Sequence, residues 1–316
     1  MSRTFRVDRG DAARRLDRLV AERLADVPGL SRSRIQEWIA AGLVRLDGAA
    51  VTRPAVRPAV GAEVEVLLPG ARSPAPPVAQ DIPLSILFED EWLLALDKPP
   101  GIVAHPTKGY ADGTLVNALL WHLGRDAGGV SLVSRLDKGT SGVMLVAKAP
   151  EAHGRLARVL KTREAEKEYL AVVYGPVPFP KGRIDRRILR DPLDPRRRTT
   201  SRTEGKDATT LWERLEESQI VLLSCRLLTG RTHQIRVHLQ AEGMPVVGDP
   251  VYGEPRWRGL RDPGLAASCR DFPRQALHAR RLRFPHPVTG GTVEVIAPVP
   301  EDLAGLLAAA GIGWAL

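Results

Sequence analysis

Arg135 and Asp137 lie two residues apart, directly before a run of apolar residues at positions 143–147. The run has the length and the β-branched content of a buried strand. Residues 137–142 (Asp-Lys-Gly-Thr-Ser-Gly) tolerate tight or left-handed backbone and predict a turn before it. In extended chain, side chains two residues apart project to the same side, so a guanidinium and a carboxylate are expected together at the mouth of the strand. Such a carboxylate could attack covalently or abstract a proton, although an ordinary surface ion pair is an equal alternative.

Several other kinds of catalytic site are absent from the sequence. It contains no Gly-x-x-x-x-Gly-Lys-Ser/Thr phosphate loop, no Gly-x-Gly-x-x-Gly, no His-Glu-x-x-His and no Gly-x-Ser-x-Gly. His233 and His238 are five residues apart and so do not share a helical face, and histidines such as His105, His122 and His278 are scattered. We therefore interpret the histidines as packing or hydrogen-bonding residues. The chemistry is expected to need no metal, no nucleotide cofactor and no histidine base.

The composition favours a polyanionic partner. The 316 residues include 46 Lys and Arg against 37 Asp and Glu, which gives a formal net charge of +9 and a pI near 10.0. Nucleic acid is the first expectation and an anionic membrane surface the second, but no basic amphipathic helix supports the second. Hydrophobic residues make up 43% of the chain, enough for a substantial core, and the length suggests either one large domain or a large domain with a small one.

The cysteine content and the pattern of apolar residues also indicate where in the cell the protein is found. Cys225 and Cys269 are the only cysteines, so neither a disulfide framework nor a cysteine zinc site is expected, and a reducing compartment is. The N-terminus lacks the apolar region of a secretory signal, and no apolar run approaches the length that spans a membrane. We expect a cytoplasmic protein with no membrane partner.

Residues 11–68 have the pattern of a compact module of helices and strands. Apolar side chains recur at helical spacing between residues 11 and 25, and Ser31 has the position of an N-cap for a second helix, residues 32–41, that Gly42 ends. Residues 43–46 and 63–68 predict strands. The module resembles the S4 RNA-binding domain at residues 15–19 (Arg-Leu-Asp-Arg-Leu), 31–35 (Ser-Arg-Ser-Arg-Ile) and 42–48 (Gly-Leu-Val-Arg-Leu-Asp-Gly).

The S4 resemblance implies a small N-terminal α/β RNA-binding domain, residues 1–68, in which Arg32, Arg34 and Arg45 bind structured RNA. Solvated surface arginines are the alternative, because residues 1–70 hold 12 Arg against 9 Asp and Glu, a net charge of only +3. Residues 69–80 contain four prolines and are expected to form a semi-extended linker to a larger domain, residues 81–316.

The larger domain is expected to be of the α+β class, with a mixed, mainly antiparallel sheet. Its pattern predicts strands at residues 84–88, 92–97, 143–147, 167–174, 219–228, 279–284 and 292–296, and helices at residues 114–122, 151–163 and 301–310. A further helix, with Thr232 as its N-cap, is expected to end at Gly243.

Residues 155–202 are the most basic segment, with 14 Lys and Arg against 6 Asp and Glu. The Pro and Asp residues among them are typical of loops. A solvated charged loop is as compatible with this charge as an RNA contact is. Beside an S4-like module we favour the RNA contact.

Residues 134–142 (Ser-Arg-Leu-Asp-Lys-Gly-Thr-Ser-Gly) closely resemble the catalytic motif of the RluA-type pseudouridine synthases, which isomerise uridine in RNA to its C-glycoside. Further motifs of that family occur in order at residues 87–106, 167–171, 228–239, 247–253 and 274–279. The resemblance spans nearly the whole chain, and the S4-like module makes the chain most similar to the ribosomal large-subunit members of the D and C types. Ser134 stands where the family usually has His, which affects support of the loop or a substrate contact rather than the reacting group.

This resemblance implies roles for five residues. Asp137 would be the nucleophile or the base, with Arg231 as a nearby cation that favours its ionised form. Tyr169 would stack on the uracil and help to remove its C5 proton, and Ile235 would form the apolar wall beneath it. Arg135 would fill the gap that remains when the uridine is flipped out of the RNA, a step that costs least in a loop or bulge.

We therefore expect a pseudouridine synthase fold and an isomerase that converts specific uridines of 23S, large-subunit ribosomal RNA, free or in a pre-ribosomal particle. It is expected to act as a monomer, without cofactor or metal. A synthase acting on tRNA is one alternative, and a non-catalytic RNA-binding or ribosome-assembly protein on the same fold is another. The joint presence of Asp137, Tyr169 and Arg231 argues against the non-catalytic alternative, because binding alone does not require that set.

Overall fold

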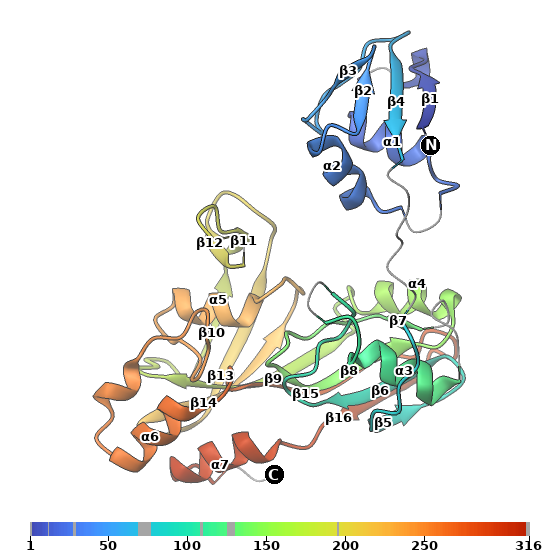
Figure 1. Cartoon of the computed structure of the whole chain (residues 1–316). Coiled ribbons are helices and arrows are strands. Elements are labelled where there is room, and N and C mark those ends of the chain that lie inside the picture. Colours follow the sequence, from blue (N-terminus) through green and yellow to red (C-terminus); the bar gives the residue numbers. More distant parts are fainter. Residues whose placement is uncertain are drawn as a thin grey trace. The chain divides into compact units, whose positions relative to one another are not determined.

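The chain divides into two units, Met1–Pro76 and Pro77–Leu316, each with a core of its own (Figure 1). The computed structural model describes residues 2–11, 13–27, 30–68, 77–107, 110–124, 130–194 and 196–313. Most of the predicted linker, residues 69–76, lies outside the described residues. At its end, the backbone of Val78 and the backbone and side chain of Gln80 bond to Asn117 and Gly113, so residues 78–80 already belong to the larger unit.

The smaller unit is an antiparallel sheet covered by two helices. Its strands are β1 (Ser2–Arg6), β4 (Glu63–Leu67), β2 (Val44–Leu46) and β3 (Ala49–Ala50), in that order, and its helices are α1 (Leu16–Arg23) and α2 (Arg32–Ala40), with a short 3-10 turn, η1 (Arg9–Asp11). The predicted N-cap is confirmed, because the Ser31 side chain accepts a hydrogen bond from the backbone of Arg34. Gly42 has the left-handed backbone expected where the helix ends. The first helix is shorter than the predicted residues 11–25.

The larger unit is built on a ten-stranded sheet. Its principal order is β10-β13-β14-β9-β15-β8-β6-β5, with β16 paired to β15 and β7 paired to β8. Within the described part of the chain, the β8–β15 pair is parallel and every other pair in this sheet is antiparallel. The expected mixed, mainly antiparallel sheet is therefore confirmed.

The strands of this sheet are β5 (Ser85–Glu89), β6 (Leu93–Lys98), β7 (Ser131–Leu132), β8 (Ser141–Ala147), β9 (Glu166–Tyr174), β10 (Lys181–Asp185), β13 (Thr209–Glu217), β14 (Ile220–Leu227), β15 (Leu277–Pro285) and β16 (Thr292–Ile296). The helices of the unit are α3 (Leu115–Leu123), α4 (Pro150–Val159), α5 (Gln234–Ala241), α6 (Pro263–Asp271) and α7 (Glu301–Ala309), with a 3-10 turn, η2 (Arg256–Gly259). No helix in the described ranges is both long and apolar enough to cross a membrane.

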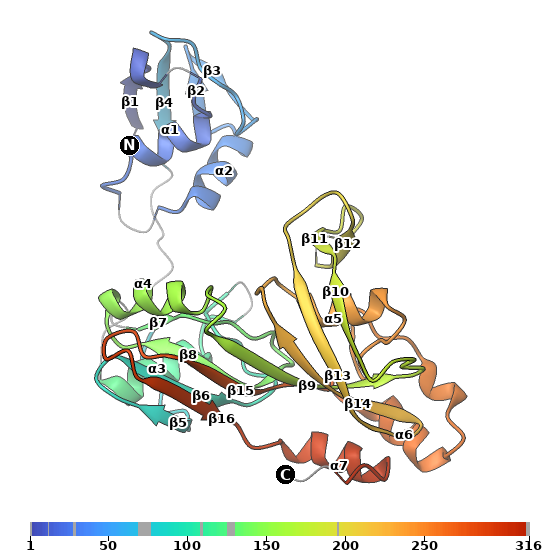
Figure 2. The ribbon, with the colours of Figure 1, turned by 180° about the vertical axis from the view of Figure 1, so that it is seen from behind.

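Strand β8 is buried on both faces. Met144 and Val146 pack with the apolar side of α3, whereas Val143, Leu145 and Ala147 pack with α4. A fully buried strand is expected to lack polar alternation, which explains why residues 143–147 form a continuous apolar run. Figures 1 and 2 show α3 and α4 beside this half of the sheet and α5, α6 and α7 beside the other half.

The register of three strands brings the start of β8 close to β9. Gly142 lies opposite Ala279 of β15, and Ala279 lies opposite Tyr169 of β9. Gly142 has φ of +108°, and a Cβ there would lie 2.2 Å from the carbonyl oxygen of Ala279. Only glycine permits this approach, so the turn before β8 is held against β15.

Two local predictions are wrong. Thr232 does not cap the helix: α5 begins after His233, whose backbone is left-handed (φ +59°) and whose side chain makes no capping bond. Gly243 does end this helix, with φ of +77°. The basic segment is also not simply a loop, because it contains β10 and a two-stranded hairpin, β11 (Arg187–Arg190) with β12 (Arg198–Ser201).

Candidate active site

Asp137 lies in a cleft of about 60 Å³ in the larger unit. It is lined by the turn before β8, by residues of strands β9, β14 and β15, and by the first turn of α5 with the segment before it. Its walls are formed by Arg135, Leu136, Asp137, Thr140, Tyr169, Leu227, Arg231, His233, Gln234, Ile235, Arg236 and Leu277. The structure thus brings together all five residues predicted for the active site: Arg135, Asp137, Tyr169, Arg231 and Ile235.

The cation that contacts Asp137 is Arg236 and not, as expected, Arg231. The Nη1 atom of Arg236 donates to Oδ2 of Asp137 at 2.7 Å. Arg231 lines the cleft, but its Nε donates to the backbone oxygen of Asp207 at 3.0 Å. The predicted carboxylate–cation pair therefore exists with a different arginine of the same motif.

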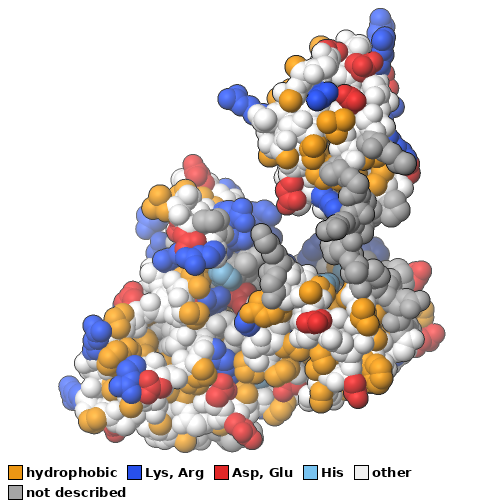
Figure 3. All heavy atoms as spheres, viewed as in Figure 1, with side chains coloured by type: hydrophobic (Ala, Val, Ile, Leu, Met, Phe, Trp, Pro, Cys, Tyr) orange, Lys and Arg blue, Asp and Glu red, His pale blue; other side chains and the backbone are white. Residues whose placement is uncertain are grey.

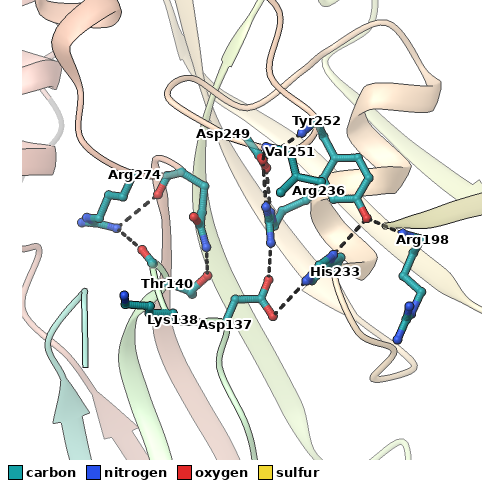
Figure 4. Close-up of polar contacts among 12 residues, drawn as sticks. Asp137, Lys138, Thr140, Arg198, His233, Arg236, Asp249, Val251, Tyr252 and Arg274 are labelled. Carbon is teal, nitrogen blue, oxygen red and sulfur yellow. Dashed lines mark hydrogen bonds and ion pairs between the residues drawn. The ribbon is translucent and has the colours of Figure 1, made fainter. Parts of the chain in front are cut away.

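Arg236 is held by a second carboxylate, Asp249 (Figure 4). Its Nε and Nη2 donate to the two oxygens of Asp249 at 2.6 and 2.8 Å. One oxygen of Asp249 also accepts the backbone N–H groups of Val251 and Tyr252. The two-point contact fixes the plane of the guanidinium, so its third nitrogen is aimed at Asp137.

Burial and pairing act in opposite directions on these groups. Burial alone would raise the pKa of Asp249, but the hydrogen bonds and the charge of Arg236 outweigh it and lower that pKa. Burial alone would lower the pKa of Arg236, but the two carboxylates raise it well above its ordinary value. The pair is therefore charged at every physiological pH, and a fixed positive charge faces Asp137.

Tyr169 and Ile235 bound the cleft on its apolar side. Ile235 is 3% exposed and lies in the first turn of α5. Burial raises the pKa of the Tyr169 hydroxyl to about 12, and the negative charge of Asp137 adds to this effect. The phenol is therefore protonated near neutral pH.

The turn that carries Asp137 is tied to the sheet from both ends. Ser134, at the position where the family that this motif resembles usually has His, accepts the backbone N–H of Leu145 at 2.9 Å. The buried Lys98 donates through Nζ to the backbone oxygen of Lys138 at 3.2 Å. Arg274 donates to the backbone oxygen of Gly139 at 3.1 Å. The hydroxyl group of Ser134 thus links the turn that carries Asp137 to strand β8.

Four residues that hold the site together were not predicted from the sequence. These are Lys98, Arg236, Asp249 and Arg274. Each lies inside a stretch that resembles the family, so the motifs themselves were the available signal. Arg135, by contrast, was predicted, and it lies exposed at the cleft.

The three arginines predicted to bind RNA all lie in the smaller unit. Arg32 donates through Nε and Nη2 to the buried carboxylate of Asp17, at 3.1 and 2.8 Å. Arg45 is exposed and lies 3.8 Å from Glu65. Arg34 is partly buried in α2. Arg32 therefore has a structural role besides any contact with RNA.

Within the residues that the structure describes, no group of three or more His, Cys, Asp or Glu side chains is arranged to hold a metal ion. Both cysteines are free and buried. The polar side chains that line the cleft are those of Arg135, Asp137, Thr140, Tyr169, Arg231, His233, Gln234 and Arg236.

Both units match known families. The sequence profile of RNA pseudouridylate synthases matches residues 92–241, and that of the S4 domain matches residues 14–64. The chain is 45% identical to the ribosomal large subunit pseudouridine synthase D of Xanthomonas campestris, over 94% of this chain and 89% of the relative. It is 39% identical to the protein of the same name in Escherichia coli, over 96% of this chain and 93% of that one. Among solved structures, human RNA pseudouridylate synthase domain containing 1 is similar with a TM-score of 0.57 and 30% identity, over 73% of this chain and 89% of that one.

Proposed function

The chain belongs to the RNA pseudouridine synthase family, and on that premise we propose that it isomerises specific uridines of 23S, large-subunit ribosomal RNA. It is an isomerase, and it carries an S4 domain. Relatives that match along nearly the full length of the chain are named ribosomal large subunit pseudouridine synthase D, which supports this choice of RNA.

One observation carries the proposed chemistry: the carboxylate of Asp137 lies in the cleft and is hydrogen-bonded by Arg236, whose guanidinium is held in place by Asp249. Isomerisation breaks the bond between N1 of the uracil and C1′ of the ribose and forms a bond from C5 to the same carbon. C5 loses a proton and N1 gains one, so atoms balance without a cofactor. A carboxylate can assist by attacking covalently or by abstracting a proton, and either role requires its ionised form. Arg236 donates a charge-assisted hydrogen bond to Oδ2 of Asp137 at 2.7 Å.

The remaining cleft residues are suited to hold the base while it turns. Tyr169 and Ile235 form an apolar surface on which a flipped uracil can lie. Because the phenol of Tyr169 is protonated near neutral pH, it enters the reaction as a hydrogen-bond donor. Its proposed help in removing the C5 proton belongs to the step that follows formation of the bond between C5 and C1′. Arg231 provides a cation at the cleft wall for the RNA backbone.

The exposed surface next to the cleft is basic. Figure 3 shows Lys and Arg side chains gathered over the β11–β12 hairpin, which carries Arg187, Arg190, Arg196, Arg197 and Arg198. Phosphate contacts of this kind position an RNA without selecting its sequence. We propose that the hairpin contacts the stem of the target, that Arg135 enters the gap left by the flipped uridine, and that Arg32, Arg34 and Arg45 contact RNA through the smaller unit.

The substrate is tested by mapping pseudouridine in cells with and without the gene. The expected result is the loss of pseudouridine at one or more positions of large-subunit ribosomal RNA, restored by the intact gene. A control strain carries Asp137→Asn, which leaves the protein in place without its carboxylate. If all ribosomal pseudouridines persist and one in tRNA disappears, the enzyme acts on tRNA and the proposed substrate is wrong. We further propose a monomeric, cytoplasmic enzyme, which size-exclusion chromatography and cell fractionation would test.

A further inference from the structure

His233 faces the second oxygen of Asp137. Arg236 contacts Oδ2 of the carboxylate, whereas Nε2 of His233 lies 3.9 Å from Oδ1. That distance is longer than a hydrogen bond, but contacts of catalytic groups often tighten when substrate binds. The proposed chemistry assigns no role to this imidazole.

The backbone of His233 is held in an unfavourable conformation. Its φ of +59° lies in the left-handed region, which is uncommon for any residue other than glycine. His233 occupies the N-cap position of α5 but makes no capping bond there. The backbone oxygen of His233 accepts the N–H of Val237, but its side chain does not cap the helix; instead the ring lies between Asp137 and Tyr252 (Figure 4).

The hydroxyl group of Tyr252 determines which nitrogen of His233 carries the proton. This oxygen accepts the backbone N–H of Arg198 at 2.7 Å and lies 2.9 Å from Nδ1 of His233. Because the oxygen already accepts one bond from a group that can only donate, its own proton is free to point at Nδ1. Nδ1 then accepts, and in the neutral ring Nε2 carries the hydrogen that faces Asp137.

Tyr252 is itself fixed by the basic hairpin. Its ring belongs to the same apolar cluster as Ile188 of β11, and the guanidinium of Arg197 lies 5.4 Å from its centre. The N–H that its oxygen accepts belongs to Arg198, the first residue of β12. Among the described residues, Nε of Arg197 is buried without a hydrogen-bond partner. Contacts therefore lead from the hairpin through Tyr252 to His233, whose Nε2 lies 3.9 Å from Oδ1 of Asp137.

We propose that His233 is a positioning residue for Asp137, and that the hydroxyl group of Tyr252, anchored on the β11–β12 hairpin, fixes its tautomer. His233 holds Oδ1 while Arg236 holds Oδ2, so the carboxylate has one orientation when the uridine arrives. Because it concerns the reaction at Asp137, this role rests on the proposed function. The hairpin proposed to contact the RNA is the element that secures this arrangement.

The first test is Tyr252→Phe, which keeps the ring and removes the hydroxyl group. We expect kcat to fall about fivefold to tenfold, the usual worth of one hydrogen bond, with KM for the RNA unchanged. In ¹⁵N-labelled protein without RNA, His233 should show the Nε2–H tautomer in the wild type and a mixture of tautomers in the variant. Full kcat together with a single Nε2–H tautomer in the variant would overturn the proposal.

The second test compares His233→Gln with His233→Ala. Both side chains suffer equally from the left-handed backbone, so the difference between the variants reports on the side-chain donor. Gln can place an amide N–H close to the position of Nε2, whereas Ala cannot. We expect His233→Gln to restore most of the kcat that His233→Ala loses, and equal losses in the two variants would contradict a donor role.

The pH dependence offers a further readout. The charged and titratable groups that face His233 are Asp137 from the turn before β8, Arg236 from α5, Asp249 and Tyr252 from the segment after it, and Arg198 from β12. Burial is the largest influence and lowers the pKa of His233. Without the Tyr252 hydroxyl group the neutral ring loses a donor, so its titration should move to higher pH. The tautomer and the titration are measured without RNA, whereas a wrong substrate assignment would appear as an inactive wild type on ribosomal RNA.

Discussion

Replacing Asp137 with Asn should separate catalysis from folding. The amide keeps the size of the side chain and one acceptor oxygen, but it can neither attack as a carboxylate nor take up a proton. We expect turnover to fall by more than ~10²-fold, the lower end of what one acid–base group contributes. Arg236 would keep its two bonds to Asp249. Because the Asp137 side chain is 26% exposed, the loss of one charge-assisted bond should lower the free energy of unfolding by only about 1 kcal/mol.

Asp249→Asn is the matched control, because it removes the same charge from the other side of Arg236. The Asp249 side chain is fully buried and accepts two guanidinium bonds and two backbone bonds. Breaking a buried ion pair of this kind costs about 3–5 kcal/mol. The lower end is expected here, because the Asn oxygen can still accept and Arg236 still has Asp137. Asp137→Asn should thus fold but lose turnover, whereas Asp249→Asn should be strongly destabilised.

Three measurements decide between the outcomes. Turnover is followed as tritium released from C5-labelled uridine in a ribosomal RNA fragment, RNA affinity by filter binding, and stability by urea denaturation. Asp137→Asn should bind RNA nearly as the wild type does. If it turns over at nearly the wild-type rate, Asp137 has no part in the mechanism. If it unfolds as readily as Asp249→Asn or no longer binds RNA, Asp137 is a structural ion-pair residue, as an ordinary surface pair before a strand would be.

Further predictions concern the S4 domain, the two arginines of the cleft and a buried histidine. Removal of residues 1–76 should weaken RNA binding and make its dependence on salt shallower, because phosphate contacts are lost; unchanged affinity and salt slope by filter binding would show that the S4 domain does not anchor this substrate. Arg236→Lys keeps the charge but cannot bridge Asp137 and Asp249, so kcat should fall at least about tenfold. Arg231→Lys should change kcat by less than about threefold, because this substitution leaves the ion pair of Asp137 with Arg236 intact. If Arg231→Lys instead lowers kcat more than Arg236→Lys does, Arg231 is the functional partner of Asp137. Burial is the main cause that lowers the pKa of His278 from 6.5 to about 4, so the unfolded chain binds a proton more readily. The folded protein is therefore fully stable with respect to this group above pH 6.5 and loses stability as the pH falls towards 4. Between these pH values, the free energy of unfolding of the wild type should fall by on the order of 3 kcal/mol more than that of His278→Gln. Urea denaturation of both proteins across this pH range would measure the difference.

What could be predicted from the sequence is what depends on neighbouring residues. Residues 143–147 showed a buried strand because both of its faces must be apolar, and the turn before it was visible in its glycines and polar residues. Asp137 could be singled out because the motif that contains it is local. The N-cap at Ser31 depends on a contact three residues along the chain, and it was predicted correctly for the same reason.

Only the tertiary structure determined which side chains of the site contact one another. The bond between Asp137 and Arg236 joins residues 99 positions apart, and helical periodicity cannot tell whether Arg231 or Arg236 is aimed at a carboxylate on another element. Tyr169 reaches the cleft because β15 lies between β8 and β9 in a register that places Gly142, Ala279 and Tyr169 side by side. Strand order and register depend on packing over the whole sheet, which no local pattern encodes.

The left-handed backbone of His233 is the clearest case. A local pattern favoured Thr232 as the cap, since Thr is a common cap and His is not. The backbone adopts the less common solution because the ring of His233 contacts Tyr252 and faces Asp137, and these contacts come from segments distant in the chain. Local preferences are small and are overridden wherever several long-range contacts agree. The sequence therefore determined the chemical groups of the site and the strand that presents the carboxylate, whereas the fold determined their partners and orientation.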